Sequence, residues 1–385
     1  MKARIAAVAA AQFTHPEYLD PSFSHALIRW QKSAGRHALP WQQSRAAYRV
    51  WLSEIMLQQT QVTAVIPYYQ KFLHSFPTVQ ALAAAPAQAV MEHWSGLGYY
   101  TRARNLHQCA KQVVAEYAGE FPADPGLLAQ LPGIGRSTAA AITAFSYGTV
   151  AAILDGNVKR VFARVFGIAG YPGSKPVETL MWQRAEALLP ETEIEAYTQG
   201  LMDLGATVCT RSRPQCGICP MQARCVAYAQ DRTAELPTRK PKKAQRHKQA
   251  LMLVMINDRQ VLLERRPDSG IWGGLLSLPE FDGMQEHDEA THAAAQLDPA
   301  LHTLIARFGQ AAALRPLPPI EHVFTHFKLH IQPCLVELHQ RYHFAGQDQY
   351  VWTNLSELAT AALPAPIKTL LLSLQHEAEP AGYPS

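Results

Sequence analysis

The residues whose types and spacing suggest chemistry lie first of all in one stretch, residues 131–160. It begins with a Pro-Gly-Ile-Gly turn that ends at Gly135, and an alanine-rich run typical of a helix follows. Backbone N–H groups at such a turn, beside the positive end of a helix, can bind phosphate, and Arg136 adds charge. Asp155 follows in an Ile-Leu-Asp-Gly-Asn turn, with Lys159 close behind. A phosphate-binding turn with a carboxylate near it predicts chemistry on nucleic acid, whereas a plain connection between two elements is the alternative.

A second group of chemically capable residues is a set of cysteines. Four of the six cysteines share one short loop with the spacing C-x6-C-x2-C-x5-C, and they are Cys209, Cys216, Cys219 and Cys225. Because the chain is large and bears no convincing export signal, a metal is favoured over disulfides. Zinc ribbons usually contain two separate C-x-x-C pairs, and only one is present here. The spacing therefore favours an iron–sulfur cluster over zinc.

Length and composition limit the possible classes of protein. A chain of 385 residues is long enough for two domains, each with its own core. The formal charge of +4 is mild, so an anionic partner is expected to meet a local basic patch. No run approaches the roughly 18 apolar residues of a membrane span. Residues 1–19 contain only a short alanine-rich run, so we interpret them as a flexible extension and expect a cytoplasmic, nucleoid-associated protein if the source is bacterial.

The elements that must position these residues are mainly helices between residues 20 and 235. Residues 48–62 are predicted as one helix, in which Leu52, Ile55 and Met56 form an apolar stripe. Glu54 lies among these apolar neighbours, so its pKa should rise if it is buried. An ordinary exposed glutamate is the alternative. Other helices are expected over residues 25–33, 177–189 and 197–207, and a helix with Ser137 or Thr138 as its N-cap follows the first glycine turn.

A second glycine turn covers residues 96–100 and is followed by Arg102 and Arg104. It is either a packed aromatic turn or a loop that presents an aromatic wedge to stacked bases, with the arginines on phosphates. Residues 236–249 hold six Lys or Arg and two Pro, which indicates a basic linker.

The pattern changes to strands from residue 250. Two apolar runs flank the turn Asn257-Asp258-Arg259 and predict a hairpin. Alternation over residues 323–338 predicts one long strand. Helices are expected over residues 288–297 and 366–375. The second domain is therefore predicted as an α+β domain over residues 250–375, with a tail at 376–385.

Taken together, these segments resemble the helix-hairpin-helix DNA glycosylases and, within them, the adenine glycosylases of the MutY type. The most specific motifs are WLSEIMLQQTQV, GLGYYTRARN, LPGIGRSTA, ILDGNVKR and the cysteine quartet. In the second domain RPDSGIWGGLLSLPEF and HVFTHF fit as well. The resemblance covers about residues 20–375. It implies a mainly α helix-hairpin-helix glycosylase domain at 20–235, with a 4Fe–4S loop at 209–225, and a Nudix-like domain that recognises 8-oxoguanine.

The resemblance also implies residue roles. Asp155 matches the aspartate that catalytic members place beside the sugar, and Asn157 is its polar neighbour. Glu54 matches the glutamate of adenine-removing enzymes. Ser137 stands where bifunctional relatives have a Schiff-base lysine, which implies a monofunctional hydrolase. The implied DNA contacts are Gln59, Thr60, Leu97, Tyr99, Gly133, Gly135, Arg136 and Ser137. The implied adenine pocket is Trp41, Leu57, Val62 and Gln199. The implied 8-oxoguanine contacts are Phe324, Thr325 and His326, and the four cysteines match the cluster ligands.

The reaction explains why these residue types are needed. Adenine leaves its sugar readily only when the base is protonated, which requires a carboxylic acid that stays protonated near neutral pH, here Glu54. The sugar left behind carries oxocarbenium charge, which an ionised Asp155 can stabilise. The base must first leave the duplex at a cost of a few kcal/mol, which inserted Tyr99 and Gln59 would offset. The expected substrate is double-stranded DNA with an A:8-oxoguanine or A:G mismatch, bound by a monomer.

The Nudix-like segment allows a competing function. Gly274, Glu280 and Glu289 fit parts of the pyrophosphohydrolase motif, but His292 and Ala293 stand where paired carboxylates would hold Mg²⁺. We therefore expect a recognition module. Oxidation turns guanine N7 into an N–H donor, which a hydroxyl acceptor such as that of Thr325 can sense. An endonuclease III-type glycosylase/lyase, a non-catalytic cluster-bearing DNA-binding protein and a Mg²⁺-dependent Nudix hydrolase remain as alternatives.

Overall fold

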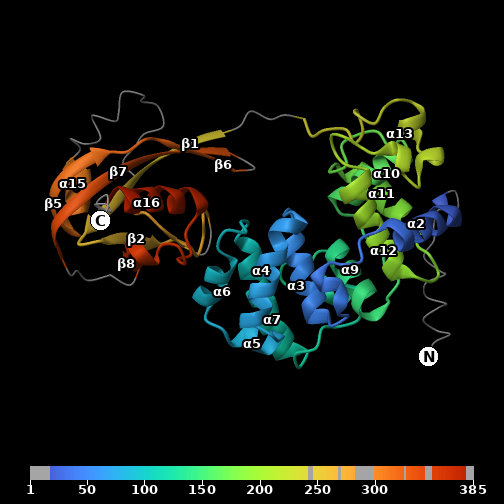
Figure 1. The fold of residues 1–385 in the computed structure, drawn as a ribbon, viewed down its shortest axis with the longest axis horizontal. Helices are drawn as coiled ribbons and strands as arrows, with labels where there is room; N and C mark the ends of the chain where they lie inside the picture. The colour runs from blue at the N-terminus through green and yellow to red at the C-terminus, as the bar shows by residue number, and fades with distance from the viewer. Residues whose placement is uncertain are drawn as a thin grey trace, which may run out of the picture. The chain divides into compact units, whose positions relative to one another are not determined.

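The computed structural model describes residues 18–241, 246–267, 270–281, 299–324, 327–342 and 349–378 (Figure 1). The chain divides into two compact units. The first contains Met1–Ala85 and Asn105–Lys242, and the second contains Pro86–Arg104 and Lys243–Ser385. The domain bounds expected above, with a linker at 236–249, stay a prediction. The extension before residue 18, the helix expected at 288–297 and the end of the tail lie outside the described residues.

The first unit is helical, as predicted. Its elements are α2 (Pro21–Ala34), η2 (Pro40–Gln43), α3 (Ala47–Leu57), α4 (Val62–Ser75), α5 (Val79–Ala84), α8 (Pro125–Leu128), α9 (Arg136–Tyr147), α10 (Gly156–Val165), α11 (Lys175–Ala187), α12 (Ile194–Asp203), the π-turn η3 (Leu204–Val208), η4 (Cys216–Ile218), η5 (Gln222–Arg224) and α13 (Val226–Ala229). Helix α7 (Thr101–Glu116) continues into it from the second unit. A core cluster that includes Val158, Phe162, Tyr197 and Leu201 joins α10 to α12. None of the described helices is long and apolar enough to cross a bilayer.

The single helix predicted over residues 48–62 is wrong, because α3 ends at Leu57 and α4 begins at Val62. Gln59 has a φ of 57°, in the left-handed region, which an α-helix cannot continue through. The intervening polar residues bury no apolar face, and Gln58 instead donates through Nε2 to the Gly133 carbonyl (3.5 Å). The break leaves Gln59 exposed in a turn, while Leu52, Ile55 and Met56 are buried as expected.

The start of α9 also differs from the prediction. Its N-cap is Gly135, which makes no side-chain cap, and neither Ser137 nor Thr138 takes that place. The Ser137 hydroxyl instead accepts a hydrogen bond from the Leu154 N–H (2.9 Å). Asp155 caps α10, since its carboxylate accepts from the Val158 N–H (2.8 Å). The glycine turn and the aspartate turn are therefore tied together next to the candidate carboxylate.

The second unit contains a mixed sheet. Its strands are β1 (Arg246–Asn257), β2 (Gln260–Arg265), β3 (Leu276–Ser277), β4 (Glu280–Phe281), β5 (Gly309–Pro316), β6 (Ile320–Val323), β7 (Phe327–Arg341) and β8 (Tyr350–Asn354). The order is β3-β2-β1-β7-β5, with β8 on β2, β4 on β1 and β6 on β7, and β1 runs parallel to β7. Helices α6 (Ala87–Trp94), α15 (Pro299–Ala306) and α16 (Ala365–Ala378) belong to the same unit. The predicted β1–β2 hairpin is confirmed, and its turn residues Asp258 and Arg259 both have positive φ, as a type I′ turn requires.

The long strand predicted over residues 323–338 is wrong. The segment is a hairpin of β6 and β7, in which His322 pairs with Leu329 and Val323 with Lys328. The Phe324 N–H donates to the Phe327 carbonyl (2.9 Å), which adds to the pairing of the two strands. Alternation of apolar side chains continues on both arms of such a hairpin, so without Gly or Pro the pattern does not reveal the turn.

Candidate active site

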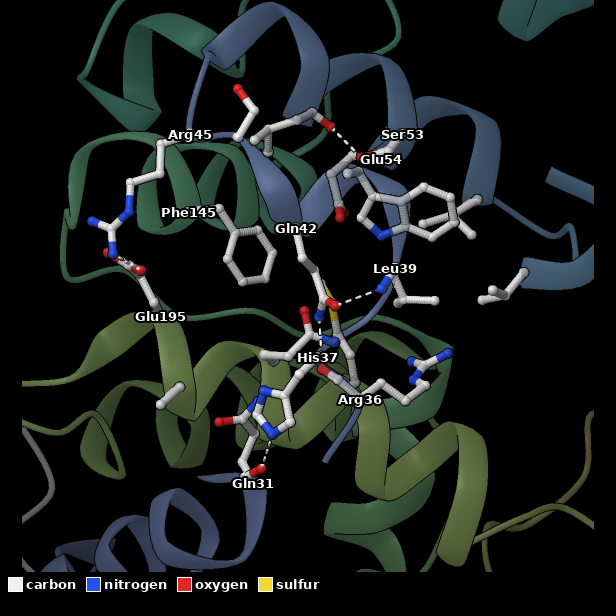
Figure 2. Close-up of a pocket in the computed structure, with 18 of the residues that line it drawn as sticks. Gln31, Arg36, His37, Leu39, Gln42, Arg45, Ser53, Glu54, Phe145 and Glu195 are labelled. Atoms are coloured by element: carbon white, nitrogen blue, oxygen red, sulfur yellow. Dashed lines mark hydrogen bonds and ion pairs between the residues drawn. The ribbon is translucent and has the colours of Figure 1, made fainter. Parts of the chain in front are cut away.

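A pocket of about 390 Å³ opens in the first unit among the loop after α2, helix α3 and helix α12 (Figure 2). Its volume lies in the range of small-molecule sites. All four residues predicted for the adenine pocket line it, namely Trp41, Leu57, Val62 and Gln199. Glu54 lines it from α3. The pocket therefore brings the predicted acid and the predicted base-binding residues together, although their roles stay a prediction.

Glu54 has the surroundings that a neutral-pH acid needs. Burial raises the pKa of its carboxyl to about 8, and the negative charge of Asp155 acts in the same direction. The neighbouring Ser53 is buried and donates to the Val50 carbonyl (2.8 Å), which leaves the carboxyl without that hydroxyl as a partner. At pH 7 Glu54 is mainly protonated and can give a proton to a bound base.

Asp155 lies at the N-terminus of α10, and the groups that act on the pKa of its carboxyl differ from those that act on Glu54. Burial raises the pKa of this carboxyl, while the N–H groups of Val158 and Asn157 lower it, as do the charges of Arg160 and Lys159. The negative charge of Asp155 acts on Glu54, so in this pair Asp155 ionises first. Lys159 is not dedicated to Asp155, since its amine pairs with Glu178.

Arg160 connects the catalytic candidates to the cysteine loop. Its guanidinium donates to Asn157 Oδ1 (2.8 Å) and to the carbonyls of Gly205 (2.7 Å) and Cys209 (2.8 Å). Gly205 lies in the π-turn η3, and π-turns are frequent at functional sites. One side chain therefore holds the start of α10 against the residue that begins the cysteine loop.

The predicted DNA contacts in the first unit have distinct conformations. Gly133 has a φ of 78°, which favours glycine, whereas Gly135 is extended. Arg136 lies over the Trp182 ring, 3.9 Å from its centre, and pairs with Glu186. That pair is exposed and worth little, so it can be exchanged for a phosphate. Thr60 Oγ1 donates to the Gln58 carbonyl (3.4 Å).

The turn at residues 96–100 belongs to the second unit. Tyr99 is 51% exposed with a φ of 49°, whereas Leu97 is buried. Arg102, expected on phosphate, is instead buried and donates to the carbonyls of Leu97 (3.4 Å) and Gly98 (3.1 Å), with its guanidinium over the Trp94 and Tyr99 rings. Arg102 therefore builds the turn that presents Tyr99, because its Nη2 group donates to two carbonyls of the turn.

Of the predicted 8-oxoguanine contacts, only Phe324 lies within the described residues, and Thr325 and His326 lie outside them. Phe324 stacks on Phe327 (4.6 Å between ring centres, 19° between planes) and meets His322 edge-on (4.6 Å). Glu280 of the Nudix-like motif pairs with Arg266 (3.0 Å). Glu289, His292 and Ala293 lie outside the described residues, so the missing Mg²⁺ ligands stay a statement about sequence.

The cysteine loop fits an iron–sulfur cluster in its donor set. Cys209, Cys216, Cys219 and Cys225 line one small cavity of about 20 Å³. N–H groups point to two of the sulfurs, from Arg164 Nη1 to Cys209 (3.4 Å) and from Met221 to Cys219 (3.4 Å), as is usual around thiolate ligands. No group of three or more His, Cys, Asp or Glu side chains in the described ranges has metal-binding geometry, these thiols included. The fit of a cluster to this loop therefore depends on two observations, the cavity that the four cysteines share and the N–H groups that donate to their sulfurs.

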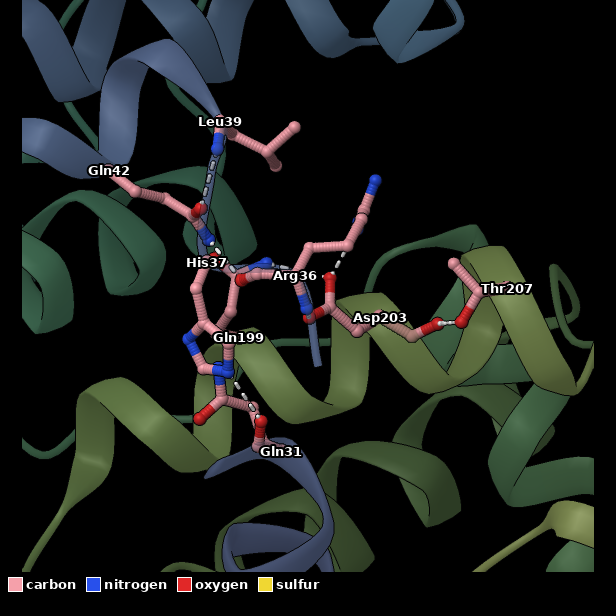
Figure 3. A network of polar contacts seen from close by, with 8 residues as sticks. All are labelled: Gln31, Arg36, His37, Leu39, Gln42, Gln199, Asp203 and Thr207. Carbon is pink, nitrogen blue, oxygen red and sulfur yellow. Dashed lines mark hydrogen bonds and ion pairs between the residues drawn. The ribbon is translucent and has the colours of Figure 1, made fainter. Parts of the chain in front are cut away.

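Sequence reasoning missed a polar network on one side of the pocket (Figure 3). Asp203 binds Arg36 and Gln199, while Gln42 accepts from the Leu39 N–H (3.0 Å) and donates to the Arg36 carbonyl (2.8 Å). The His37 ring lies 2.9 Å from the Gln31 carbonyl. Arg45 and Glu195 form an ion pair (2.6 Å) elsewhere in the lining. In the sequence, Arg36 is marked only by its place between Gly35 and the Leu-Pro-Trp segment. That local pattern does not reveal that Arg36 binds Asp203, more than 160 residues later.

Comparisons with known proteins agree with this geometry. Family models match for a HhH-GPD superfamily base excision DNA repair protein (residues 52–187), an iron–sulfur binding domain of endonuclease III (209–225) and a NUDIX domain (251–373). An adenine DNA glycosylase of Buchnera aphidicola subsp. Schizaphis graminum (strain Sg) is 35% identical over 350 residues, 91% of this chain and 97% of that one. An adenine DNA glycosylase of Mus musculus is 32% identical over 401 residues, covering 90% and 76%.

Among solved structures, a thermostable thymine-DNA glycosylase matches with a TM-score of 0.50 and 28% identity, over 54% of this chain and 96% of that chain. That match supports the fold of the helical part. The identity to the adenine enzymes extends over nearly the whole chain, second unit included. The chain therefore belongs to the adenine DNA glycosylase family, base excision repair hydrolases that act on N-glycosyl bonds and carry a 4Fe–4S cluster.

Proposed function

We propose that the chain is a monofunctional glycosylase that hydrolyses adenine from duplex DNA where adenine lies opposite 8-oxoguanine or guanine. The observation that carries the proposal is the Glu54 carboxyl, whose pKa of about 8 reflects burial and the charge of Asp155, in a pocket of base-binding size. Glu54 protonates the extruded base at N7, and Asp155 stabilises the cation that forms on the sugar.

Other residues contact the DNA or hold the catalytic carboxylate in place. Asn157 and Arg160 hold the start of α10, and exposed Tyr99 enters the base stack as the base leaves it. Ser137 fits a hydrolase without a lyase step, since its hydroxyl is engaged with the Leu154 N–H and it carries no amine. The four cysteines hold the cluster, which ties the basic loop together when bound. Phe324 and its two neighbours contact 8-oxoguanine in the opposite strand.

The test is base release from duplexes that differ only in the residue opposite adenine. Purified enzyme is incubated with A:8-oxoguanine, A:G and A:T duplexes, and strand cleavage is measured after alkali. We expect release from the first two, none from A:T, no release by Glu54→Gln and normal release by Glu191→Gln, which removes an exposed charge. Full turnover by Glu54→Gln contradicts the assignment.

A borohydride experiment separates the monofunctional proposal from a glycosylase/lyase. A lyase forms a Schiff base with a lysine, and Lys159 is the lysine next to the candidate site. We expect only weak trapping. Efficient trapping that Lys159→Ala abolishes contradicts the proposal.

The same proposal includes a monomer that acts at chromosomal DNA, in the cytoplasm if the source is bacterial. One chain contains both carboxylates, the cluster loop and the recognition residues, so no second copy is required. Sedimentation with one equivalent of mismatched duplex should give a 1:1 complex.

A further inference from the structure

The pocket contains a polar arrangement that the catalytic roles leave unused (Figure 3). Asp203, at the end of α12, has a side chain that is 1% exposed. It accepts hydrogen bonds from the Arg36 backbone N–H (2.8 Å) and from Arg36 Nε (2.6 Å). Gln199, one turn earlier on α12, donates from Nε2 to Asp203 Oδ1 (2.8 Å). The carboxylate thus joins the loop after α2 to a residue that lines the pocket.

This carboxylate determines which end of the Gln199 amide faces it. As a carboxylate paired with a guanidinium, Asp203 offers only acceptors, so Gln199 must present its NH₂ group. Oε1 is then the remaining polar atom of this pocket-lining side chain, and no described residue hydrogen-bonds to it. The two ends of an amide have nearly the same shape, so without such a partner the group can turn over.

Close packing keeps the arrangement in place. A Cβ added at Gly35 would lie 2.5 Å from the Gln31 carbonyl oxygen and 3.1 Å from Asp203 Oδ2. A Cβ added at Gly200 would lie 3.0 Å from Leu27 Cγ, so α2 and α12 approach closely beside Gln199. Asp203 and Gln199 therefore have little freedom to separate.

Given the proposed function, we propose that Asp203, held by Arg36, is a positioning residue that turns the Gln199 carbonyl oxygen toward the base. The pocket then accepts a 6-amino purine and rejects a 6-oxo purine. The 6-amino group of adenine donates a hydrogen bond, whereas O6 of hypoxanthine or guanine accepts one and would face a second acceptor. Both purines carry N7, so the proton transfer from Glu54 is common to them and the selection acts at a separate atom.

The test compares release of adenine and of hypoxanthine opposite the same 8-oxoguanine, under single-turnover conditions. The wild-type enzyme should strongly prefer adenine. In Asp203→Asn the amide at position 203 can donate or accept, so Gln199 is free to turn. We expect the adenine-to-hypoxanthine rate ratio to fall by about tenfold or more, since mismatched hydrogen-bonding groups dominate this kind of discrimination. Glu191→Gln, which removes an exposed carboxylate before α12, should keep the wild-type ratio.

A double variant distinguishes positioning from general support of the fold. In Gln199→Glu/Asp203→Asn the amide at position 203 donates to the carboxylate at position 199, whose other oxygen still faces the base. The donor and acceptor are exchanged, and the pair keeps its total charge. We expect the rate ratio to return toward the wild-type value, a rescue that a merely structural role for Asp203 does not provide.

Two results overturn the inference: an Asp203→Asn enzyme with a normal melting curve and the wild-type ratio, or a double variant no more selective than the single one. If Asp203→Asn folds poorly, Gln199→Ala is the test instead, because it leaves the Arg36–Asp203 pair intact. This variant must still show a lower adenine-to-hypoxanthine rate ratio, and an unchanged ratio contradicts the inference. A wild-type enzyme that releases no adenine from this duplex contradicts the proposed function itself. Adenine release with an unaltered ratio in every variant contradicts only the inference.

Discussion

At the residue scale, Glu54 and Asp155 are two carboxyl groups whose surroundings separate their protonation states. Glu54 has no cation among the causes of its raised pKa, which are burial and the charge of Asp155. Desolvation raises the pKa of Asp155 as well, but two backbone N–H groups and two cations favour its charged form. When two acids interact in this way, the group whose anion is better stabilised loses its proton first, and glycosidases divide the acid and anion roles between two carboxyl groups. This difference supports Glu54 as the acid and Asp155 as the anion.

Base release should decline at alkaline pH. The folded-state pKa of Glu54 is raised to about 8, so the acid form is lost as the pH rises through that value. Single-turnover rates on an A:8-oxoguanine duplex should fall about tenfold per pH unit well above 8. A rate that stays constant to about pH 9.5 contradicts the assignment of Glu54 as the acid.

Glu54→Gln should stabilise the fold at neutral and alkaline pH. Between the ordinary glutamate pKa of 4.5 and the folded-state pKa of about 8, the native state binds more protons at Glu54 than the unfolded state. The free energy of unfolding of the wild type therefore falls as the pH rises through this window. The stability that Glu54 provides in its protonated form is complete only below the window. We expect the variant to gain a few kcal/mol at about pH 8.5 and almost nothing at about pH 4.

Urea unfolding at those two pH values measures the effect on stability. Glu191→Gln should change stability little at either pH, since it removes an exposed carboxylate. A Glu54→Gln enzyme that is equally or less stable than wild type at the alkaline pH means that Glu54 is solvated in the folded protein.

At the element scale, short turns position the candidate residues more than the helices that they connect. The turn before α9 depends on Gly133, whose left-handed backbone allows the carbonyl to meet Gln58. The π-turn after α12 depends on Gly205, which lies directly against Asn157. Each turn therefore links a predicted DNA-contacting or catalytic residue to a distant part of the chain.

Gly133→Ala should lower both stability and DNA affinity. Its φ of 78° is unfavourable for alanine, and the new Cβ would lie 2.9 Å from Asn105 Cβ. We expect a loss of about 1–2 kcal/mol in the free energy of unfolding. Gly135→Ala is the matched control, because its backbone is extended and the added Cβ meets nothing within 4 Å. Equal stability of the two variants in urea contradicts the strain argument.

Gly205→Ala should slow base release while DNA affinity stays similar. The added Cβ would lie 2.6 Å from Asn157 Cβ and 3.2 Å from its Cα, so the first turn of α10 must move and carry Asp155 with it. A displacement near 1 Å can cost about a hundredfold in rate. Gly217→Ala in the cysteine loop meets open space and should behave like wild type. Single-turnover kinetics and binding to uncleavable duplex separate the two effects.

At the scale of the whole molecule, one chain contains two different folds. The family matches cover the helical repair domain, the cluster loop and the NUDIX domain in that order along the chain. The candidate chemistry lies in the first unit, whereas Phe324 and its aromatic neighbours lie in the second. Each unit can therefore be altered separately, and the two changes should affect different measurements.

Phe324→Ala should reduce the preference for A:8-oxoguanine over A:G and leave adenine release from A:G nearly unchanged. Its ring stacks on Phe327, and Phe324 directly precedes the predicted recognition residues Thr325 and His326 in the sequence. Rates on the two duplexes give the preference directly. Tyr342→Ala, at an exposed aromatic residue after β7, should keep the wild-type preference. A lower rate on both duplexes by the same factor would place Phe324 outside 8-oxoguanine recognition.

The sequence by itself determined the features that depend on local spacing. Four cysteines within one loop, the Pro-Gly-Ile-Gly turn, the β1–β2 hairpin and the family motifs were all recognisable, because each is set by residues close together in the chain. The family and its cofactor followed from these motifs and are confirmed by the comparisons. The catalytic and recognition roles of single residues stay predictions.

Only the tertiary structure decided the rest. The pKa of Glu54, the end of α3 at Leu57, the engagement of Arg102 within its own turn and the Arg36–Asp203 pair could not be read from spacing. The physical reason is that desolvation and hydrogen bonding depend on which groups surround an atom in space. For Glu54 the interacting charge is Asp155, and for Asp203 the paired cation is Arg36, and each of these lies more than 90 residues away along the chain.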